Sequence, residues 1–474
     1  MLKLVLVLYS CFGVVSFGAA DSILIRSISI VDGTGAQKTG PLDIEITGNR
    51  ISRIGANLKT KAGKIIDGHG KFAIPGLIDT HTHLHSVPGS VFRKDSENEI
   101  QRQQVFQLKA YLAAGVTTVL DAAAPESLFK EISEGKNTSP RVLALAPFLT
   151  PQGGYFASVE ARGKIYSDLW TPLVDETSAD AHFEKAARLN ALGTKVTLEK
   201  GFGPFEVWPI FDESFRSTIV AKARKYNSPL FIHSMSKEEH RLALSMQPYA
   251  LVHAGFDDQV ADAEIIQEIK NSVVYVSTTL AIYKMMLLMW DSKTLNEPWI
   301  RMLVPPEQIE TALNVEATKK VVEKIVLDSK PWWVPKFLAR LLSGLFLNQA
   351  IIEKQLARSQ KSVALMQEAG IPLVMGSDAG NWPVWSTFFH GVGSILEVEA
   401  LHEAGLSPME VIIASTSRAA KLLKMDSEIG KIGEGMIADI IILNEDPLTN
   451  PTAYRNLNFV IKDGVAKTPA EWLL

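Results

Sequence analysis

The chain has 474 residues, of which 46% are hydrophobic and 21% charged. This length accommodates a large α/β domain with an accessory module, and the composition is that of a globular protein with a buried core. The formal net charge is −4 and no basic tract is present, which argues against nucleic acid as a partner.

Residues 1–20 differ in character from the rest of the chain. Lys3 precedes the apolar run LVLVLYSCFGVVSF, and small residues follow at positions 18–20. This order is typical of a signal peptide and predicts a periplasmic or secreted protein. A membrane-spanning helix would need a longer apolar run. Lipid attachment at Cys11 is the minor alternative.

Both ends of the remaining chain have the pattern of short strands separated by Gly, Asn or Asp. ILIRSISIVDG and LDIEITGNRISRIG lie in residues 21–75, and GMIADIIILNEDP and NFVIKDGVA lie in residues 428–474. Such segments are typical of a small all-β unit. We predict one β-sandwich domain assembled from these two ranges.

Residues 76–427 alternate apolar strands with helical runs, which is the order of parallel βα units. Eight segments have the pattern of strands: GLIDTHTH, VTTVLDA, VLALAPF, KVTLE, PLFIH, ALVHA, VVYVST and IPLVMGSD. Eight βα units predict an α/β fold of the (β/α)8 TIM-barrel type.

A long insertion at about 280–360 separates the last two predicted strands. It contains KPWWVPKFLARLLSGLFLNQAII, in which one helix would present a broad apolar face. This face consists of Trp332, Trp333, Phe337, Leu338, Leu341, Leu342, Leu345 and Phe346. Packing on the barrel or a contact in a homo-oligomer fits best, followed by a lid over the site. Peripheral membrane contact through residues 332–347 fits least.

The stretch GLIDTHTHLH, residues 76–85, carries histidines at alternate positions. In a strand, His81 and His83 share a face, and at the C-terminal end of a barrel strand that face points into the mouth. By alternation His85 would lie on the same face as this pair, but it follows the strand, so we expect it in a loop or behind the ligands. A His-x-His pair by itself is a weak sign of function.

Three more predicted strands end in side chains that can bind a metal: His233, His253 and Asp378. Burying such groups is costly unless they have partners. A metal at the barrel mouth would explain these three residues together with His81 and His83, because imidazole and carboxylate are suitable zinc ligands.

With these motifs in order, the chain resembles the amidohydrolase superfamily over nearly its whole length. The resemblance includes IPGLIDTHTH, AGVTTVLD, FIHS, LVHAG, GSDAG, STSRAAKLL and GKIGEGMIADIIIL. The sequence pattern is most similar to that of secreted prolidase-type dipeptidases and carboxypeptidases, and less similar to that of imidazolonepropionase-like enzymes. The resemblance implies hydrolysis of an amide bond in a small peptide or N-acyl amino acid by two divalent ions, expected to be Zn²⁺.

The resemblance also implies roles for individual residues. His81, His83 and Asp378 would bind the more buried metal, and His233 and His253 the second. A metal-bridging hydroxide would attack the substrate carbonyl, and Asp378 would move its proton to the leaving nitrogen.

The bridging ligand has two candidates in LGTKVTLEKGFGP. Relatives commonly use a carboxylated lysine at the end of strand four, which Lys195 matches best. Glu199 shares its face by alternation and lies nearer the strand end, and some relatives bridge with glutamate. We favour Lys195 slightly over Glu199. Lys200, on the opposite face, is the weakest candidate.

Tyr155 in TPQGGYF follows the third strand, where relatives often place a Gly-Gly-His loop. Its hydroxyl could hydrogen-bond the tetrahedral intermediate or merely close the loop, and both interpretations stay open. His390 is expected to be structural. Arg162, Lys164 and Arg301 are candidates for binding a substrate carboxylate, without any sign that singles one out.

Other reactions remain open on the same residues. A mononuclear site without the bridging lysine would suit cyclic-amide hydrolysis or deamination. An activated hydroxide would also attack a lactone or ester. A non-catalytic binding protein is disfavoured because the ligand residues are all present, although a fold alone does not prove activity.

Overall fold

The structure is a computed structural model, and it describes residues 22–133, 139–155, 170–201, 208–255, 259–316, 318–320, 323, 327, 333–346, 348–381 and 385–474. The predicted signal peptide, residues 1–20, lies outside this part, as do Arg162 and Lys164. Within the described residues, no helix is both long enough and apolar enough to cross a membrane.

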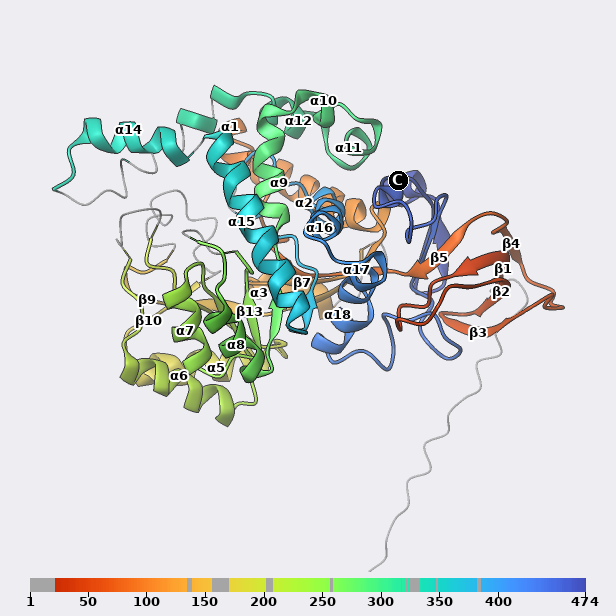
Figure 1. Cartoon of the computed structure of the whole chain (residues 1–474), viewed down its shortest axis with the longest axis horizontal. Helices are drawn as coiled ribbons and strands as arrows, with labels where there is room; N and C mark the ends of the chain where they lie inside the picture. Colours follow the sequence, from red (N-terminus) through yellow and green to blue (C-terminus); the bar gives the residue numbers. More distant parts are fainter. Residues whose placement is uncertain are drawn as a thin grey trace, which may run out of the picture.

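A mixed sheet of eight strands combines the two ends of the chain (Figure 1). Its strands are β1 (Ser22–Ile30), β2 (Thr39–Thr47), β3 (Arg50–Gly55), β4 (Lys64–Asp67), β5 (Phe72–Pro75), β16 (Ile440–Leu443), β17 (Leu457–Lys462) and β18 (Val465–Lys467). The two ends meet where β5 pairs antiparallel with β16. Isoleucines from both ends, including Ile25, Ile44 and Ile440, form one buried cluster. Burial of these β-branched residues explains why strands so distant in sequence share one sheet.

The middle of the chain forms two parallel sheets. The first contains β6 (Leu77–Thr82), β7 (Val116–Asp121) and β8 (Arg141–Ala144). The second contains β9 (Ala146–Pro151), β10 (Trp170–Leu173), β11 (Thr194–Thr197), β12 (Leu230–His233), β13 (Ala250–Val252), β14 (Tyr275–Ser277) and β15 (Leu373–Val374). All eight segments predicted as strands contain one, and VLALAPF forms both β8 and β9, which Leu145 separates. The edge strand β10 was not among the predicted strands, because Pro172 weakens its strand pattern.

Backbone hydrogen bonds join the two parallel sheets on both sides. On one side, the N–H of Leu192, two residues before β11, donates to the carbonyl of Ala144 at the end of β8 at 2.9 Å. On the other side, the N–H of Thr80 donates to Met375 at 2.9 Å, and the N–H of Asp378 donates to His81 at 2.8 Å. The first and last strands, β6 and β15, therefore lie side by side, and the residues that follow them meet.

Helices follow or precede most of the parallel strands (Figure 1). They are α1 (Ser90–Arg93), α2 (Glu97–Ala113), α3 (Glu126–Ser133), α5 (Glu176–Arg188), α6 (Glu213–Lys225), α7 (Lys237–Ser245), α8 (Ala263–Ser272), α9 (Ala281–Leu287), α10 (Ser292–Leu295), α11 (Pro298–Leu303), α12 (Pro306–Ala312), α14 (Lys336–Phe346), α15 (Gln349–Glu368), α16 (Val392–Glu403), α17 (Pro408–Ser415), α18 (Ser417–Leu422) and α19 (Pro469–Leu473). Local sequence sets several starts: Ser96 and Glu99 form a capping box at α2, as Ser236 and Glu239 do at α7.

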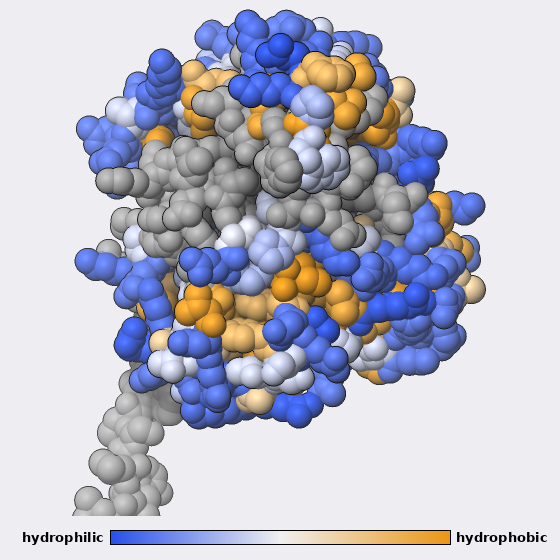
Figure 2. Space-filling model, turned by 90° about the vertical axis from the view of Figure 1, so that its left-hand side faces the viewer, coloured by the Kyte–Doolittle hydropathy of each residue, from blue (hydrophilic) through white to orange (hydrophobic). Residues whose placement is uncertain are grey.

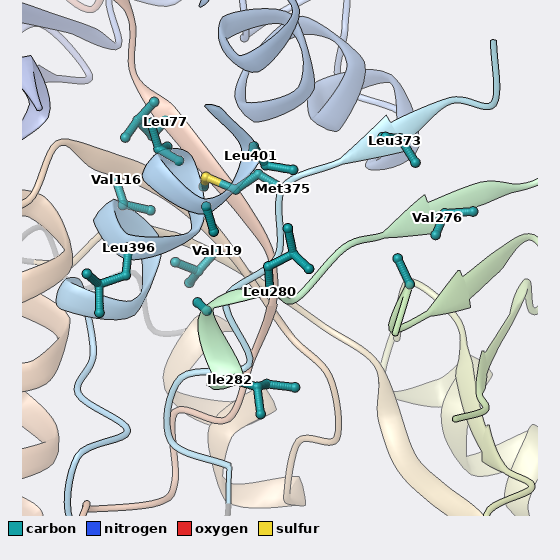
Figure 3. Close-up of a cluster of buried hydrophobic side chains, with 14 of the residues drawn as sticks. Leu77, Val116, Val119, Val276, Leu280, Ile282, Leu373, Met375, Leu396 and Leu401 are labelled. Atoms are coloured by element: carbon teal, nitrogen blue, oxygen red, sulfur yellow. The ribbon is translucent and has the colours of Figure 1, made fainter. Parts of the chain in front are cut away.

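The core lies between the parallel strands and α16 (Figure 3). Leu77 of β6 and Val119 of β7 belong to the same buried cluster as Leu396 and Leu401 of α16. Met375, just after β15, belongs to this cluster too. Burial of these side chains, at about 25 cal/mol per Å² of apolar surface, holds α16 against the strands that carry the predicted ligands.

Candidate metal centre

The structure brings together three predicted ligands from the first and last parallel strands. Nε2 of His81 and Nε2 of His83 each lie 3.1 Å from Oδ1 of Asp378. His81 is in β6, His83 follows it directly, and both His81 and Asp378 are buried. The alternation of HTH thus places both imidazoles toward one carboxylate, as the sequence predicts.

Asp378 has an oxygen atom that suits a cation. Within the described part of the chain, its buried Oδ1 accepts no hydrogen bond, although two imidazole nitrogens lie within 3.1 Å. One ligand atom each from His81, His253 and Asp378 lies within 4.8 Å of the others. An unsatisfied buried carboxylate oxygen is costly, so this arrangement fits a divalent metal ion coordinated by these groups.

The second pair of predicted ligands lies beside the first. Nε2 of His253 is 2.9 Å from Nδ1 of His233, and the rings of His253 and His81 are 5.3 Å apart. Nδ1 of His253 lies 2.7 Å from the Thr279 hydroxyl, which orients this imidazole. All five predicted histidine and aspartate ligands therefore belong to one cluster.

Two of these ligands have an unusual backbone conformation. His253 has φ of 74° and Asp378 has φ of 57°, both in the left-handed region. Residues other than glycine seldom adopt such angles, and they cluster at functional sites where the fold maintains them. Here the turn places each side chain just beyond its strand, toward the cluster.

Burial keeps the imidazoles of His81, His233 and His253 neutral, which is the form that binds metal. The pKa of His81 is lowered to about 3, first by burial and then by the charge of Lys195. The pKa values of His233 and His253 are also well below the usual value, mainly because both are buried. Burial alone would raise the pKa of Asp378, but contact with His81 and His83 holds it well below its usual value.

Both candidates for the bridging ligand lie in the cluster. Nζ of Lys195 in β11 is 3.3 Å from Nε2 of His81, and burial lowers the pKa of this lysine to about 8. Oε2 of Glu199 is 2.7 Å from Nε2 of His233. Lys195 therefore touches the first set of ligands and Glu199 the second. Lys200 pairs instead with Glu238 at 3.0 Å.

Tyr155 lies against the second pair of ligands. Its buried ring is 5.0 Å from the ring of His233 and 5.2 Å from that of Trp208. Its place beside a predicted ligand fits either interpretation of this residue, and Trp208 is a neighbour that the sequence did not indicate.

The remaining candidates are distributed around this cluster. His85 lies 5.9 Å from His83 between ring centroids, and His83, His85 and Asp121 form a second group whose ligand atoms lie within 4.8 Å. His390 contacts the loop after β6, with Nε2 2.9 Å from the carbonyl of Ser86. Arg301 of α11 is exposed and donates to Asn296.

Several residues that hold the predicted ligands in place were not predicted from the sequence. Asp79 accepts hydrogen bonds from the N–H of His81 at 3.1 Å and of Ser377 at 3.0 Å. Burial raises its pKa to about 6, and these hydrogen bonds act against that rise. The amide of Asn381 donates to Oδ2 of Asp378 at 2.6 Å. Asp79 has the parity of the HTH histidines, so alternation was a signal that could have found it.

Comparison with known proteins agrees with this geometry. The Amidohydrolase family model matches residues 72–468. A 5'-deoxyadenosine deaminase from Methanothrix thermoacetophila is 45% identical over 62 residues, 13% of this chain and only 14% of that protein. A crystal structure of a Xaa-Pro dipeptidase with bound methionine in the active site has a TM-score of 0.69 at 19% identity, covering 94% of this chain and 99% of that one. A prolidase complexed with N-methylphosphonate-L-proline has a TM-score of 0.69 at 17% identity, with coverages of 94% and 99%.

At these identities the solved structures show a shared fold, a mixed α/β architecture with parallel sheets. The family model spans most of the chain, and it describes metal-dependent hydrolases. The protein therefore belongs to the amidohydrolase family.

Proposed function

We propose that this enzyme hydrolyses an amide bond in a small peptide or an N-acyl amino acid. Two divalent ions, with Zn²⁺ the expected metal, would be held by His81, His83, Lys195, His233, His253 and Asp378. Neutral imidazole and carboxylate ligands of this kind suit zinc. The hydrogen bonds that link the parallel sheets on both sides support a closed (β/α)8 barrel in residues 76–427, with a β-sandwich built from residues 21–75 and 428–474.

One observation carries this proposal. The buried Oδ1 of Asp378 lies between the nitrogens of His81 and His83 and accepts no hydrogen bond within the described residues. A purely structural aspartate would have its acceptor atoms satisfied, as Asp79 does in the same core. The arrangement therefore supports a centre made for a cation.

The chemistry divides between the metal and the protein. A divalent ion lowers the pKa of water and stabilises negative charge on the substrate oxygen. The carboxylate of Asp378, which is ionised, accepts a proton from the attacking water and delivers it to the leaving nitrogen. Tyr155, beside His233, donates its hydroxyl proton in a hydrogen bond to the developing oxyanion. The buried histidines exclude bulk water, which strengthens each of these interactions.

A second candidate function has its own support. Glu199 contacts His233 at 2.7 Å, closer than Lys195 is to His81 at 3.3 Å. A site in which Glu199 serves His233 and Lys195 stays unmodified would hold a single metal. Such a site would suit deamination or opening of a cyclic amide, and the short match to a deaminase agrees with this alternative.

Metal content and a substrate panel test the two candidates together. Elemental analysis would compare wild type with Lys195→Ala, Glu199→Ala and the matched control Lys200→Ala, whose lysine pairs with Glu238. We expect about two metal equivalents per chain, with a loss in the Lys195 variant only. The panel would contain dipeptides, N-acyl amino acids, cyclic amides, aminopurine nucleosides and lactones.

The possible outcomes separate the proposals. Hydrolysis of a dipeptide or N-acyl amino acid, abolished by Asp378→Asn in a folded protein, supports the amide hydrolase. One equivalent of metal that neither Lys195→Ala nor Glu199→Ala changes, with turnover of a cyclic amide or an aminopurine, supports the mononuclear site. A protein that takes up no metal would contradict both.

A further inference from the structure

Helix α14 and the turn before it carry two separate apolar faces. Val334 and Ala339 are fully buried against the rest of the protein. Trp333, Phe337 and Leu341 follow one another at intervals of four residues, and their exposed fractions are 63%, 74% and 69%. Phe337 and Leu341 lie four apart in α14 and therefore form a stripe on the same side of the helix, and Trp333 is exposed in the turn before it. Among the described side chains of this segment, Val334 and Ala339 are thus covered by the chain, whereas Phe337 and Leu341 are largely open to solvent.

The stripe lies at one end of the molecule. In Figure 1, α14 is at the far end from the sheet that contains β1 to β4. Figure 2 views the molecule from this end and shows hydrophobic groups in its upper part among mostly hydrophilic neighbours. Exposed apolar patches with a polar rim are typical of surfaces that bind a partner or a membrane.

The charge of this region differs in sign from that of the whole protein. Residues 316–352 contain six Lys or Arg and three Asp or Glu, a net charge of +3, in a chain whose net charge is −4. On α14 itself both charged residues are basic: Lys336 is exposed, and Arg340 pairs with Glu323. A basic helix with an exposed aromatic and aliphatic stripe complements an anionic, apolar surface.

A second copy of the chain fits this surface less well. A twofold contact would place the same patch against itself and would bring Lys336 of one copy close to Lys336 of the other. Like charges in such a contact are unfavourable. An anionic lipid surface avoids this repulsion, and its interface accepts Trp and Phe side chains beside basic residues.

We propose that the outer face of α14, formed by Phe337 and Leu341 with Lys336 beside them, docks the enzyme on an anionic lipid surface together with Trp333 in the preceding turn. The helix lies parallel to the membrane, with the apolar stripe in the headgroup region and the basic side chains next to lipid phosphates. This contact is independent of the metal centre and does not require a membrane-spanning helix.

Vesicle binding tests this proposal. The purified protein would be sedimented with vesicles of mixed phosphatidylglycerol and phosphatidylcholine, and with vesicles of phosphatidylcholine alone. The variants are Phe337→Ser/Leu341→Ser, Lys336→Glu, and the control Ile65→Ser, which removes another exposed apolar side chain on β4. Comparing the variants in the full chain cancels any contribution of the apolar residues 1–20. Circular dichroism and light scattering would monitor folding and oligomeric state.

The expected result is binding to the anionic vesicles that is weak or absent with phosphatidylcholine alone and falls with added salt. Partitioning should fall at least about tenfold in Phe337→Ser/Leu341→Ser and about tenfold in Lys336→Glu, and stay unchanged in Ile65→Ser. Equal partitioning of wild type and all variants, or no binding by wild type, would overturn the proposal. So would a dimer that only Phe337→Ser/Leu341→Ser dissociates, since α14 would then contact a second copy. If the double variant misfolds, Lys336→Glu alone decides.

Discussion

The hydroxyl of Ser394 donates a 2.6 Å hydrogen bond to Oδ2 of Asp79, tying α16 to the strand that carries His81. The other oxygen of Asp79 accepts the backbone N–H groups of His81 and Ser377. One buried carboxylate thus joins the segments that precede His83 and Asp378. We infer that Asp79 and Ser394 act as positioning residues, because a small shift of either segment would separate the metal ligands.

Replacing Ser394 by Ala should lower both stability and metal affinity. The change removes one hydrogen bond to a buried carboxylate and should reduce the free energy of unfolding by about 2 kcal/mol. Urea unfolding and metal titration would measure the two effects. Ser415→Ala is the control: this buried hydroxyl donates within its own helix, to the carbonyl of Val411 at 2.7 Å. Equal effects of the two changes on metal affinity would contradict the positioning role.

Glu397 should make stability depend on pH. Burial raises its pKa to about 8 from an ordinary value of 4.5, against the hydrogen bonds from Thr278 and Ala281. Between these two values the folded protein retains a proton that the unfolded chain releases. The contribution of this residue to stability is therefore greatest below about pH 4.5 and is lost as pH rises toward 8, by at most about 1.4 kcal/mol per pH unit.

The variant Glu397→Gln isolates this effect. Glutamine does not titrate, and its carbonyl oxygen still accepts the Ala281 N–H while its amide group donates to the Thr278 hydroxyl. Urea unfolding at about pH 5 and about pH 8 should show that wild type loses stability relative to the variant as pH rises. A stability difference that is the same at both pH values would show that Glu397 does not retain its proton.

Tyr155→Phe separates the two interpretations of this residue. The phenyl ring keeps its contacts with His233 and Trp208, so only the hydroxyl is lost. If the hydroxyl stabilises the oxyanion, kcat should fall about 100-fold while metal content and KM stay the same. Tyr226→Phe is the matched control, since the Tyr226 hydroxyl donates a hydrogen bond to Asp180 of α5 and not to a residue of the cluster. An unchanged kcat would show that Tyr155 only closes the loop.

Much of the centre could be predicted because its signals are local. The alternation of Asp79, His81 and His83 requires only that residues 77–82 form a strand, which their apolar and β-branched neighbours favour. His233 ends β12, and His253 directly follows β13, as the sequence pattern predicts. Polar side chains at the ends of apolar strands therefore pointed to four residues of this cluster, and Asp378 followed from the same logic.

Other features depend on contacts between distant residues. The edge strand β10 exists because Trp170–Leu173 pairs with β9, which outweighs the low strand propensity of Pro172. In the described part of the insertion, Val334 and Ala339 are buried whereas Phe337 and Leu341 are exposed, a division that depends on what α14 packs against. The left-handed backbone of His253 and Asp378 is maintained by hydrogen bonds to neighbouring strands, which a sequence pattern does not record.

The sequence by itself determined which residue types stand at the ends of which strands, because strand periodicity and burial are properties of a few neighbouring residues. Only the tertiary structure decided which of them meet. Asp378 reaches His81 because β15 lies beside β6 although almost three hundred residues separate the two ligands. Lys195 and Glu199 have the same parity, but the packing of β11 and its following loop directs one to His81 and the other to His233. Closing these long loops costs conformational entropy, and burial of the core offsets that cost. The close packing of the core then sets the distances between residues at the centre.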